Sequence, residues 1–342
     1  MNARDAERLF VRLPNWVGDV VMATGVLRRL REAAPNAEIV LEGRGFLRGL
    51  LAGLDSFDDF LAEPKRGFTA ARAHAKLLRA RGFDMAVLLP DSARVAFAPW
   101  LAGIPVRVGY ARDVARKLLV SRPLPPPRVG RARLAIPMPK RYMAILNAVG
   151  IEGDAAPAEL HVDPAADTAL LKRLAAHGLA DARLLVVNPG ASFGASKLYP
   201  PAQMAAACAQ LAARTDLRVV MAPGPGEEGI AQQVAAELPD ALVLQDPVTS
   251  LAELVALTAR AALVISNDTG PRHMAVALGR PVVTLMGPTD RRHTDYQLDD
   301  QRVLLEPVDC APCHLKDCPI DHRCMTRLAP ERVVDAGLEL LA

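Results

Sequence analysis

The sequence predicts an α/β protein with two doubly wound domains, each built on a parallel sheet. The chain has 342 residues, a length that favours two domains. Short apolar runs typical of buried strands alternate with helix-like stretches along the whole chain. Two strand–loop–helix junctions, at residues 9–19 and 261–274, lie far apart in the sequence. One such junction in each half predicts two nucleotide-fold domains that face each other across a cleft.

The elements of the first half alternate from the start. The proline-rich stretch 122–128 predicts a loop. Residues 151–163 follow Gly150 and are expected to link the two domains, which we place at 1–160 and 161–342. We expect strands at residues 9–13, 39–41, 57–61, 85–89 and 106–109, and helices at 19–33, 69–81 and 140–149.

The second half repeats this alternation. Strands that alternate with helices form parallel sheets through right-handed crossovers, so both halves are expected to be doubly wound. A last helix at 330–341 is a candidate to pack back on the N-terminal domain. We expect strands at residues 184–188, 217–222, 241–244, 261–266 and 281–286.

The composition is that of a globular protein. Hydrophobic residues make up 51% of the chain and charged residues 23%, which is ordinary for this class. The sequence contains no run of about 18 apolar residues that would span a membrane. Residues 1–8 are charged and lead directly into a strand, unlike a signal peptide. We therefore expect a cytoplasmic protein.

Charge is distributed unevenly between the two halves. Residues 1–165 contain 25 Lys and Arg against 17 Asp and Glu, and the remainder contains 16 against 21. Residues 107–141 alone hold ten basic residues and one acid, Asp113. This basic segment is either a solvated face or a patch for an anionic partner, such as a phosphorylated substrate or an acidic lipid. Few aromatic residues and no helix-turn-helix or zinc-finger signature argue against nucleic acid.

The first junction carries an acidic residue, Asp19, directly after residues 14–18, and this residue is a candidate for catalysis. A carboxylate that faces a ligand site can take a proton from a sugar hydroxyl as that hydroxyl attacks, so Asp19 is a candidate general base. The alternative role for the same residue is a helix cap.

The loop at residues 188–197 has the composition of an anion site. It follows a strand, and its small residues, Gly190 among them, let backbone N–H groups approach a phosphate. Ser192, Ser196 and Lys197 add donors and charge. The loop lacks the Walker A pattern, and the alternative is a flexible loop without a ligand.

Residues 224–229 match a dinucleotide fingerprint, and Asp246 follows about 20 residues later. Two adjacent acids, Glu227 and Glu228, would repel a pyrophosphate, which disfavours a dehydrogenase. One of these acids is instead a candidate to accept hydrogen bonds from a ribose diol, and the sequence does not decide between them.

At the second junction, Asp268, Thr269 and Gly270 precede His273. The Thr269 hydroxyl and the N–H groups of Thr269 and Gly270 are candidates to bind phosphate at the positive end of a helix. His273, one turn later, would add a donor. The alternative is that Asp268 caps the helix and His273 is an ordinary helix residue.

Four cysteines cluster near the C-terminus, whereas Cys208 stands apart. Such density within fifteen residues of a cytosolic protein indicates a metal site more than disulfides. A structural zinc or iron–sulfur site is one interpretation, and free or redox-active thiols are the other. The four are Cys310, Cys313, Cys318 and Cys324.

Taken together, these segments resemble the ADP-heptose:lipopolysaccharide heptosyltransferases of glycosyltransferase family 9, and among them the heptosyltransferase II branch. The resemblance covers nearly the whole chain in order, and some members share a cysteine-rich stretch ending in Cys-Met. One departure is Tyr199, where the family more often has Trp before the proline. The matching segments are 16–19, 90–92, 102–105 with Gly109, 189–191 with 193–194 and Lys197, 267–270 with His273, and 287–288.

The resemblance implies a GT-B fold and an inverting transfer of heptose from ADP-L-glycero-D-manno-heptose to the inner core of lipopolysaccharide. It implies no required cofactor, and the chain has no Asp-x-Asp motif of the kind that clamps a metal-bound nucleotide sugar. Asp19 would be the general base. Lys197, with Thr269 and Gly270, would neutralise the diphosphate, and Asp268 would hydrogen-bond the heptose.

The same resemblance assigns the partners. The protein would be a monomer associated peripherally with the inner face of the cytoplasmic membrane. The N-terminal domain would bind a lipid A–Kdo–heptose acceptor through Asn15, Trp16, Gly18, Asp91 and Ser92. The C-terminal domain would bind ADP-heptose through the junction and loop residues above, including Gly190, Ser192, Ser196, Glu227 and His273.

Two alternative functions stay open. One is a related transferase for another nucleotide sugar or acceptor, and the other is a non-enzymatic metal-binding module centred on the cysteines.

Overall fold

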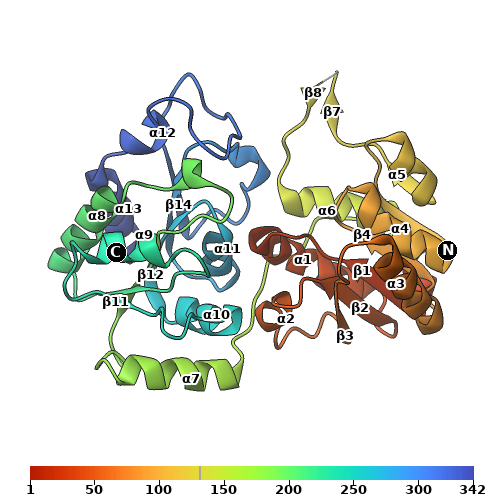
Figure 1. Cartoon of the computed structure of the whole chain (residues 1–342), viewed down its shortest axis with the longest axis horizontal. Coiled ribbons are helices and arrows are strands. Elements are labelled where there is room, and N and C mark those ends of the chain that lie inside the picture. Colours follow the sequence, from red (N-terminus) through yellow and green to blue (C-terminus); the bar gives the residue numbers. More distant parts are fainter. Residues whose placement is uncertain (131) are drawn as a thin grey trace. The chain divides into compact units, whose positions relative to one another are not determined.

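The computed structural model describes residues 1–130 and 132–342, which form two compact units (Figure 1). The N-terminal unit comprises Met1–Glu159 and Arg292–Thr294, and the C-terminal unit comprises Leu160–Arg291 and Asp295–Ala342. Each unit has its own parallel sheet with helices on both faces. The predicted fold class is therefore confirmed for each unit.

The N-terminal sheet has six parallel strands in the order β3-β2-β1-β4-β5-β6. All four residues of β4 are buried, as expected for a strand that helices cover on both faces. In this strand order, the switch point of a doubly wound sheet lies between β1 and β4. The strands are β1 Arg8–Arg12, β2 Glu38–Gly43, β3 Asp59–Ala62, β4 Met85–Leu88, β5 Val106–Tyr110 and β6 Arg122–Leu124.

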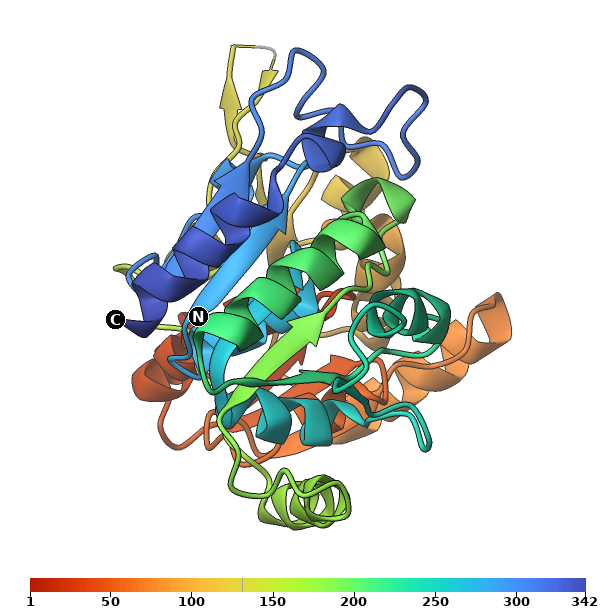
Figure 2. The same ribbon diagram turned by 90° about the vertical axis from the view of Figure 1, so that its left-hand side faces the viewer.

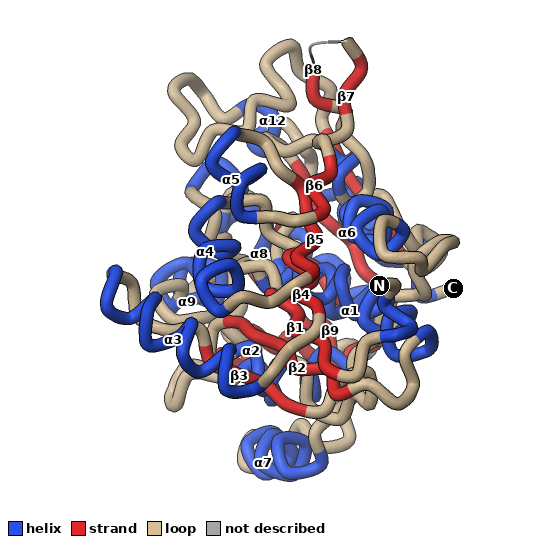
Figure 3. Tube along the Cα trace, turned by 90° about the vertical axis from the view of Figure 1, so that its right-hand side faces the viewer, coloured by secondary structure: helices blue, strands red, loops and turns tan. Residues whose placement is uncertain are grey.

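Helices flank this sheet on its two faces, as Figure 3 shows. On one face α1 packs against α6, and on the other α3, α4 and α5 pack in sequence. Phe10, Leu78 and Leu88 belong to the core beneath α3 and α4. The helices are α1 Val17–Ala33, α2 Leu47–Leu50, α3 Phe68–Arg81, α4 Ala93–Ala102, α5 Val114–Leu119 and α6 Met138–Asn147.

The C-terminal sheet repeats the same topology, with the order β11-β10-β9-β12-β13-β14. Its switch point therefore lies between β9 and β12. Every pair of neighbouring strands runs parallel. The strands are β9 Leu184–Asn188, β10 Arg218–Met221, β11 Leu242–Val243, β12 Ala261–Asn267, β13 Val282–Met286 and β14 Gln301–Leu305.

Two helix layers cover this second sheet. On one face α8 lies beside α13 (Figure 2) and also contacts α9, and α10 packs against α7 and α11. Leu211 on α8 and Val333 on α13 share a core with Leu263 on β12. The final helix thus packs in its own unit, and packing on the N-terminal unit stays a prediction. The helices are α7 Pro164–Ala175, α8 Pro201–Arg214, α9 Glu228–Ala235, α10 Leu251–Ala259, α11 Gly270–Ala277, α12 Arg323–Thr326 and α13 Pro330–Leu341.

Two strands differ from the sequence expectation. β6 lies in the proline-rich stretch for which a loop was expected, and its Pro123 pairs with Gly109 of β5. Proline is tolerated there because β6 is an edge strand, whose outer N–H groups need no partner in the sheet. β14 was not predicted, since polar Gln301 and Arg302 begin it. A two-stranded antiparallel hairpin, β7 (Arg128–Val129) with β8 (Ala132–Arg133), adds to the N-terminal unit.

Gly25, in the middle of α1, packs against the segment that links the two units. A Cβ at this position would lie 2.0 Å from the carbonyl oxygen of Ala156 and 2.9 Å from that of Pro157. Gly25→Ala is therefore expected to lower the thermal midpoint by several degrees, because overpacking costs about 1–3 kcal/mol and outweighs the better helix propensity of alanine. Differential scanning calorimetry measures the change.

Gly229 in α9 offers the matched control. Nothing lies within 4 Å of an added Cβ there, so Gly229→Ala is expected to leave the midpoint unchanged or to raise it. A Gly25→Ala protein as stable as the wild type would contradict the packing of the linking segment on α1.

Candidate functional site

Most of the predicted site residues lie at or just after the carboxyl ends of the central strands in both units. In the N-terminal unit the loops after β1 and β4 carry residues 13–16 and 89–92, and in the C-terminal unit the loops after β9 and β12 carry residues 189–200 and 268–269. These are the switch points, where parallel sheets of this kind bind ligands. Each unit thus presents one candidate half-site, built by the same topology.

Asp19 lies in the first turn of α1 and is half-buried. The N-cap position of this helix is Trp16, so the alternative role of Asp19 as the cap is wrong. Its charge acts on Tyr142 of α6: burial, and then the Asp19 carboxylate, raise the pKa of the Tyr142 phenol well above its usual value. Asp19 thus lies in the first turn of the helix that follows β1, near enough to α6 for its charge to act on Tyr142.

The other N-terminal candidates differ in their surroundings. Asn15 Oδ1 accepts a hydrogen bond of 3.3 Å from Arg12 at the end of β1. Trp16 exposes half of its surface, a large apolar group beside the Asp19 turn, whereas Gly18 is buried. Asn15 and Trp16 thus lie close to Asp19 in sequence, at the start of α1, where an acceptor contact was expected.

Asp91 is engaged by two guanidinium groups. Its Oδ2 atom lies 3.2 Å from Arg141 Nη2 and 3.5 Å from Arg112 Nε. Arg141 also lies over the ring of Tyr110, 4.3 Å from the ring centroid. Asp91 thus neutralises these two cations, and the role of Asp19 as general base of this unit stays a prediction.

A buried arginine, which the sequence did not point to, fixes the Asp91–Ser92 loop. Arg116 has no exposed surface, and its guanidinium donates to the carbonyl oxygens of Pro90 at 2.8 Å, of Tyr110 at 3.1 Å, and of Ser92. Burial lowers the pKa of Arg116 to about 10, so it stays charged at neutral pH. Ser92, at the N-cap position of α4, is thereby held through its backbone.

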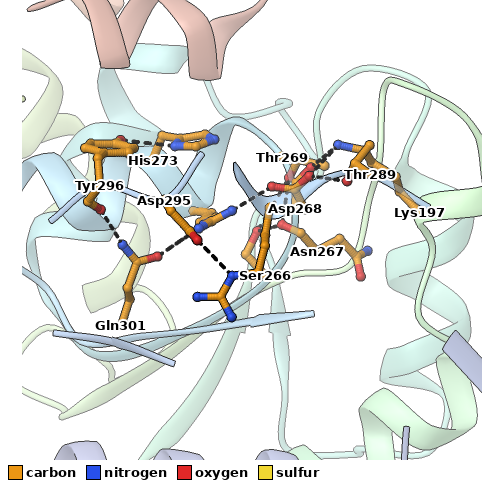
Figure 4. A network of polar contacts seen from close by, with 12 residues as sticks. Lys197, Ser266, Asn267, Asp268, Thr269, His273, Thr289, Asp295, Tyr296 and Gln301 are labelled. Carbon is orange, nitrogen blue, oxygen red and sulfur yellow. Dashed lines mark hydrogen bonds and ion pairs between the residues drawn. The ribbon is translucent and has the colours of Figure 1, made fainter. Parts of the chain in front are cut away.

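In the C-terminal unit a buried carboxylate, Asp268, organises the half-site (Figure 4). Lys197 Nζ donates to Asp268 Oδ2 at 2.7 Å and to the Asp268 carbonyl oxygen at 2.7 Å. Thr289 Oγ1 donates to the same Oδ2 at 2.7 Å, and Arg272 Nη1 donates to Oδ1 at 2.8 Å. The Asp268 side chain is 6% exposed and that of Lys197 12%. The structure therefore brings Asp268 and Lys197 together, and adds Thr289 and Arg272, which the sequence analysis did not assign.

The charge state of this cluster follows from its geometry. Burial opposes the charged form of Asp268, but Lys197 and Arg272 outweigh it and hold the pKa of the carboxyl well below its usual range. With two cations around one anion, the cluster keeps a net positive charge that suits a phosphate group. The alternative role of Asp268 as a helix cap is wrong, since Thr269 occupies the N-cap position of α11.

Asn267, the last residue of β12, binds both ends of the loop that follows β9. Its side-chain amide donates to the carbonyl oxygens of Pro189 at 2.7 Å and Gly190 at 3.2 Å, and its Oδ1 accepts from the N–H of Tyr199 at 3.2 Å. The Tyr199 hydroxyl donates to the Leu328 carbonyl oxygen at 2.7 Å. Tyr199, the departure from the family pattern, is thus a buried anchor of the loop.

Thr269 and Gly270 begin α11 directly after this cluster. The Thr269 N–H donates to the Asn267 carbonyl oxygen at 2.7 Å, which bends the chain into the helix. The hydroxyl of Ser266 donates to the same carbonyl oxygen at 2.7 Å. The tight turn places the positive end of α11 beside Lys197 and Thr289, so phosphate binding by Thr269 and Gly270 remains the predicted role.

His273 is buried one turn into α11. Its Nδ1 lies 3.1 Å from the Tyr296 hydroxyl, and the two rings stack with centroids 5.8 Å apart (Figure 4). Burial, reinforced by Arg272, lowers the pKa of His273 to about 3. The imidazole is therefore neutral at physiological pH, and its contact with a phosphate stays a prediction.

Glu227 and the loop after β9 meet at Gly190. A Cβ on Gly190 would lie 2.1 Å from Glu227 Cδ, so the carboxylate covers this glycine. Glu227 Oε2 accepts from the Gly224 N–H at 3.1 Å, and Ser192 Oγ lies 3.5 Å from Oε1. Of the two acids, Glu227 is thus the one that reaches the loop. The glycine pattern 224–229 follows β10, the second strand of its unit, whereas a dinucleotide fingerprint follows the first.

Ser196 has a structural contact in place of an open hydroxyl. It is 2% exposed, and its Oγ donates to the Leu315 carbonyl oxygen at 2.5 Å. Direct phosphate contact by Ser196 stays a prediction, which this arrangement does not favour. The contact could not be read from the sequence, because the two residues are far apart along the chain.

All five cysteines are free thiols. Cys310 and Cys313 are exposed, Cys318 is half-buried and Cys324 is buried. Among residues 1–130 and 132–342, no three His, Cys, Asp or Glu side chains are grouped so that they would hold a metal ion. Metal binding by Cys310, Cys313, Cys318 and Cys324 therefore stays a prediction, which elemental analysis of the purified protein would test.

Several known proteins resemble this chain. The family model described as glycosyltransferase family 9 (heptosyltransferase) matches residues 71–323. Lipooligosaccharide heptosyltransferase 2 of Haemophilus influenzae is 26% identical over 96% of this chain and 98% of its own. The structure of Escherichia coli ADP-heptose lps heptosyltransferase II superposes with a TM-score of 0.81, at 25% identity and 98% coverage of both chains. A family 9 glycosyl transferase from Veillonella parvula, 22% identical, shares the fold with a TM-score of 0.84 over 100% of this chain and 98% of its own.

The buried neutral His273 makes a pH prediction. A histidine in an unfolded chain has a pKa of about 6.5, whereas that of His273 is lowered to about 3. Below about pH 6.5 the unfolded chain takes up a proton that the folded chain does not, so this group makes stability fall as the pH is lowered, by about 1.4 kcal/mol per pH unit. We expect the thermal midpoint of His273→Asn, which no longer titrates, to fall less between pH 7 and pH 5. Parallel losses in both proteins would contradict the burial of a neutral imidazole.

Proposed function

This chain belongs to glycosyltransferase family 9, the heptosyltransferases, and we propose that it transfers a heptose from ADP-L-glycero-D-manno-heptose to the inner core of lipopolysaccharide. The proposed acceptor is lipid A–Kdo that already carries one heptose. The named relatives that align with the chain over nearly its whole length support this choice. The observation that carries the proposal is the cluster in which Lys197, Arg272 and Thr289 surround Asp268 at the carboxyl end of the C-terminal sheet. Its net positive charge suits a diphosphate.

The proposed donor site uses the charges of that cluster. Lys197 stabilises the negative charge that develops on the diphosphate as the sugar leaves, together with the Thr269 hydroxyl and the N–H of Gly270. Glu227, which covers Gly190, would accept hydrogen bonds from the ribose of the nucleotide. Asp268 serves first as the counter-ion that holds Lys197 in place, and a contact from Asp268 to the heptose remains the finer proposal.

The proposed reaction is a single displacement with inversion. Asp19 accepts the proton of the acceptor hydroxyl, whose oxygen attacks the anomeric carbon while the bond from that carbon to the diphosphate oxygen breaks. ADP departs with the electron pair of the broken bond. Asn15 and Trp16 beside the Asp19 turn, and the Asp91–Ser92 loop held by Arg116, would contact the acceptor. The proposed enzyme is a monomer that requires no cofactor.

A transfer assay with purified lipid acceptor tests the proposal. We expect turnover with ADP-heptose and little with UDP- or GDP-sugars. Asp19→Asn is expected to lower kcat at least about 100-fold, the lower range for loss of a general base, with ADP affinity unchanged. Lys197→Ala is expected to weaken ADP binding and to slow transfer together, since its charge acts in both states.

Two exposed residues supply the controls for these variants, Asp55 for the acid and Lys172 for the lysine. Asp55→Asn and Lys172→Ala should behave as the wild type. Substantial turnover by Asp19→Asn would refute the assignment of the base, and equal use of UDP-sugars would refute the donor.

We also propose peripheral binding to the inner leaflet through the basic segment of residues 107–141. None of the helices in the described part of the chain combines the length and apolar character needed to cross a bilayer. On the surface of this segment Val114, Leu118 and Val129 are 73%, 74% and 66% exposed. They lie among exposed basic residues, Lys117 and Arg128 for example. Apolar side chains within a cationic field suit an anionic lipid surface.

Vesicle sedimentation tests the membrane proposal. Binding to vesicles with anionic phospholipid is expected to exceed binding to neutral vesicles and to weaken as salt rises, because screening shortens the range of the charges. Val114→Ser with Leu118→Ser is expected to reduce binding several-fold. Leu77→Ser, at an exposed leucine of α3, is the control. Equal binding to neutral and anionic vesicles would refute the proposal that the basic segment binds anionic lipid.

A further inference from the structure

The cysteine-rich segment, residues 310–325, forms hydrogen bonds with the loop that carries Lys197. Three polar groups of Ser196 are bound by this segment. The Ser196 N–H donates to the Lys316 carbonyl oxygen at 2.9 Å, and the Ser196 hydroxyl donates to the Leu315 carbonyl oxygen at 2.5 Å. The Ser196 carbonyl oxygen lies 2.7 Å from His322 Nε2, which must carry the proton because a carbonyl only accepts. Ser196 is the residue directly before Lys197.

The backbone of residue 194 lies so close to the backbone of Lys316 that only glycine fits at position 194. A Cβ on Gly194 would lie 2.4 Å from the Lys316 carbonyl oxygen and 2.9 Å from Lys316 Cα. Gly194 also has a φ of +157°, which L side chains rarely adopt. The loop therefore fits against the cysteine-rich segment only because residue 194 has no side chain.

The cysteine-rich segment also touches the second loop of the donor half-site. The His314 N–H donates to the Pro288 carbonyl oxygen at 2.8 Å. A Cβ on Gly287 would lie 2.7 Å from Met325 Sδ and 2.9 Å from Cys324 Sγ. Thr289, the next residue after Pro288, donates to Asp268. Both loops that supply side-chain partners to Asp268 Oδ2 thus rest on the same segment.

We propose that the cysteine-rich segment is a clasp that sets donor affinity, with His322 as a positioning residue for Lys197. His322 itself is fixed: its backbone lies in the left-handed region at φ +58°, and its N–H donates to Cys318 Sγ at 3.3 Å. The inference rests on the proposed function, because it assigns the clasp to the site that binds the ADP diphosphate. It gives the segment a role that does not depend on metal.

Loss of the His322 side chain is expected to weaken binding of the sugar donor and to leave binding of the acceptor unchanged. The Ser196 carbonyl is part of a buried residue, so removing its partner leaves an unsatisfied acceptor that favours rearrangement of the loop. Lys197 would then lose its fixed position beside Asp268. Glutamine carries an amide nitrogen where histidine carries Nε2, so His322→Gln can keep the hydrogen bond, whereas His322→Leu cannot.

Calorimetric titration with ADP, together with transfer kinetics, tests the proposal. His322→Leu is expected to raise the Kd for ADP and the KM for the donor about tenfold, as for one lost buried hydrogen bond. The KM for the acceptor should not change. His322→Gln should stay near the wild type. A general loss of stability would not produce this split between donor and acceptor, nor the rescue by glutamine.

The matched control is His177→Leu, at an exposed histidine of the same unit, which should bind ADP as the wild type does. If His322→Leu does not fold, Ser196→Ala, which removes only the bond to Leu315, is measured in its place and is expected to weaken ADP binding severalfold. Unchanged ADP affinity in the folded variant would refute the proposal that the cysteine-rich segment sets donor affinity. Failure of the wild type to bind ADP would overturn the proposed function instead.

Discussion

The buried carboxylate of Asp268 is the constraint on which the C-terminal half-site depends. It collects a lysine from the loop after β9, an arginine from α11 and a threonine from the loop after β13. A carboxylate out of water must have such partners, since breaking a buried pair typically costs about 3–5 kcal/mol. The same requirement that stabilises the fold therefore gathers two cations at the proposed diphosphate site.

The N-terminal unit also buries an ionic group, but this group is a cation. There a buried guanidinium, Arg116, is satisfied mainly by backbone carbonyls, and it shapes the loop that presents Asp91. Two sheets of the same strand order thus use buried ionic groups to fix the loops after their central strands. On the proposed function, Asp19 of one unit would be the base and Lys197 of the other would stabilise the leaving diphosphate.

Much of this architecture could be predicted from local sequence, and the remainder could not, for physical reasons. β9 and α13 have the predicted bounds, because apolar runs and proline at a helix start are local signals. β6 was mistaken for a loop, since proline is compatible with an edge strand. The hydrogen bond from Ser196 to Leu315 could not be predicted, because the two residues are 119 positions apart in sequence. Arg116 and Arg272 resemble surface arginines until the fold buries them.

The pairing of Lys197 with Asp268 also bears on how an enzyme of this kind is emptied after each cycle. On the proposed function, the diphosphate would meet an ammonium group that keeps its own counter-ion, so the attraction would be weaker than that of an unpaired lysine. When the spent nucleotide departs, Lys197 would still face the Asp268 carboxylate, and no unpaired charge would be left in the buried site. The pairing would thus lower the free-energy cost of product release.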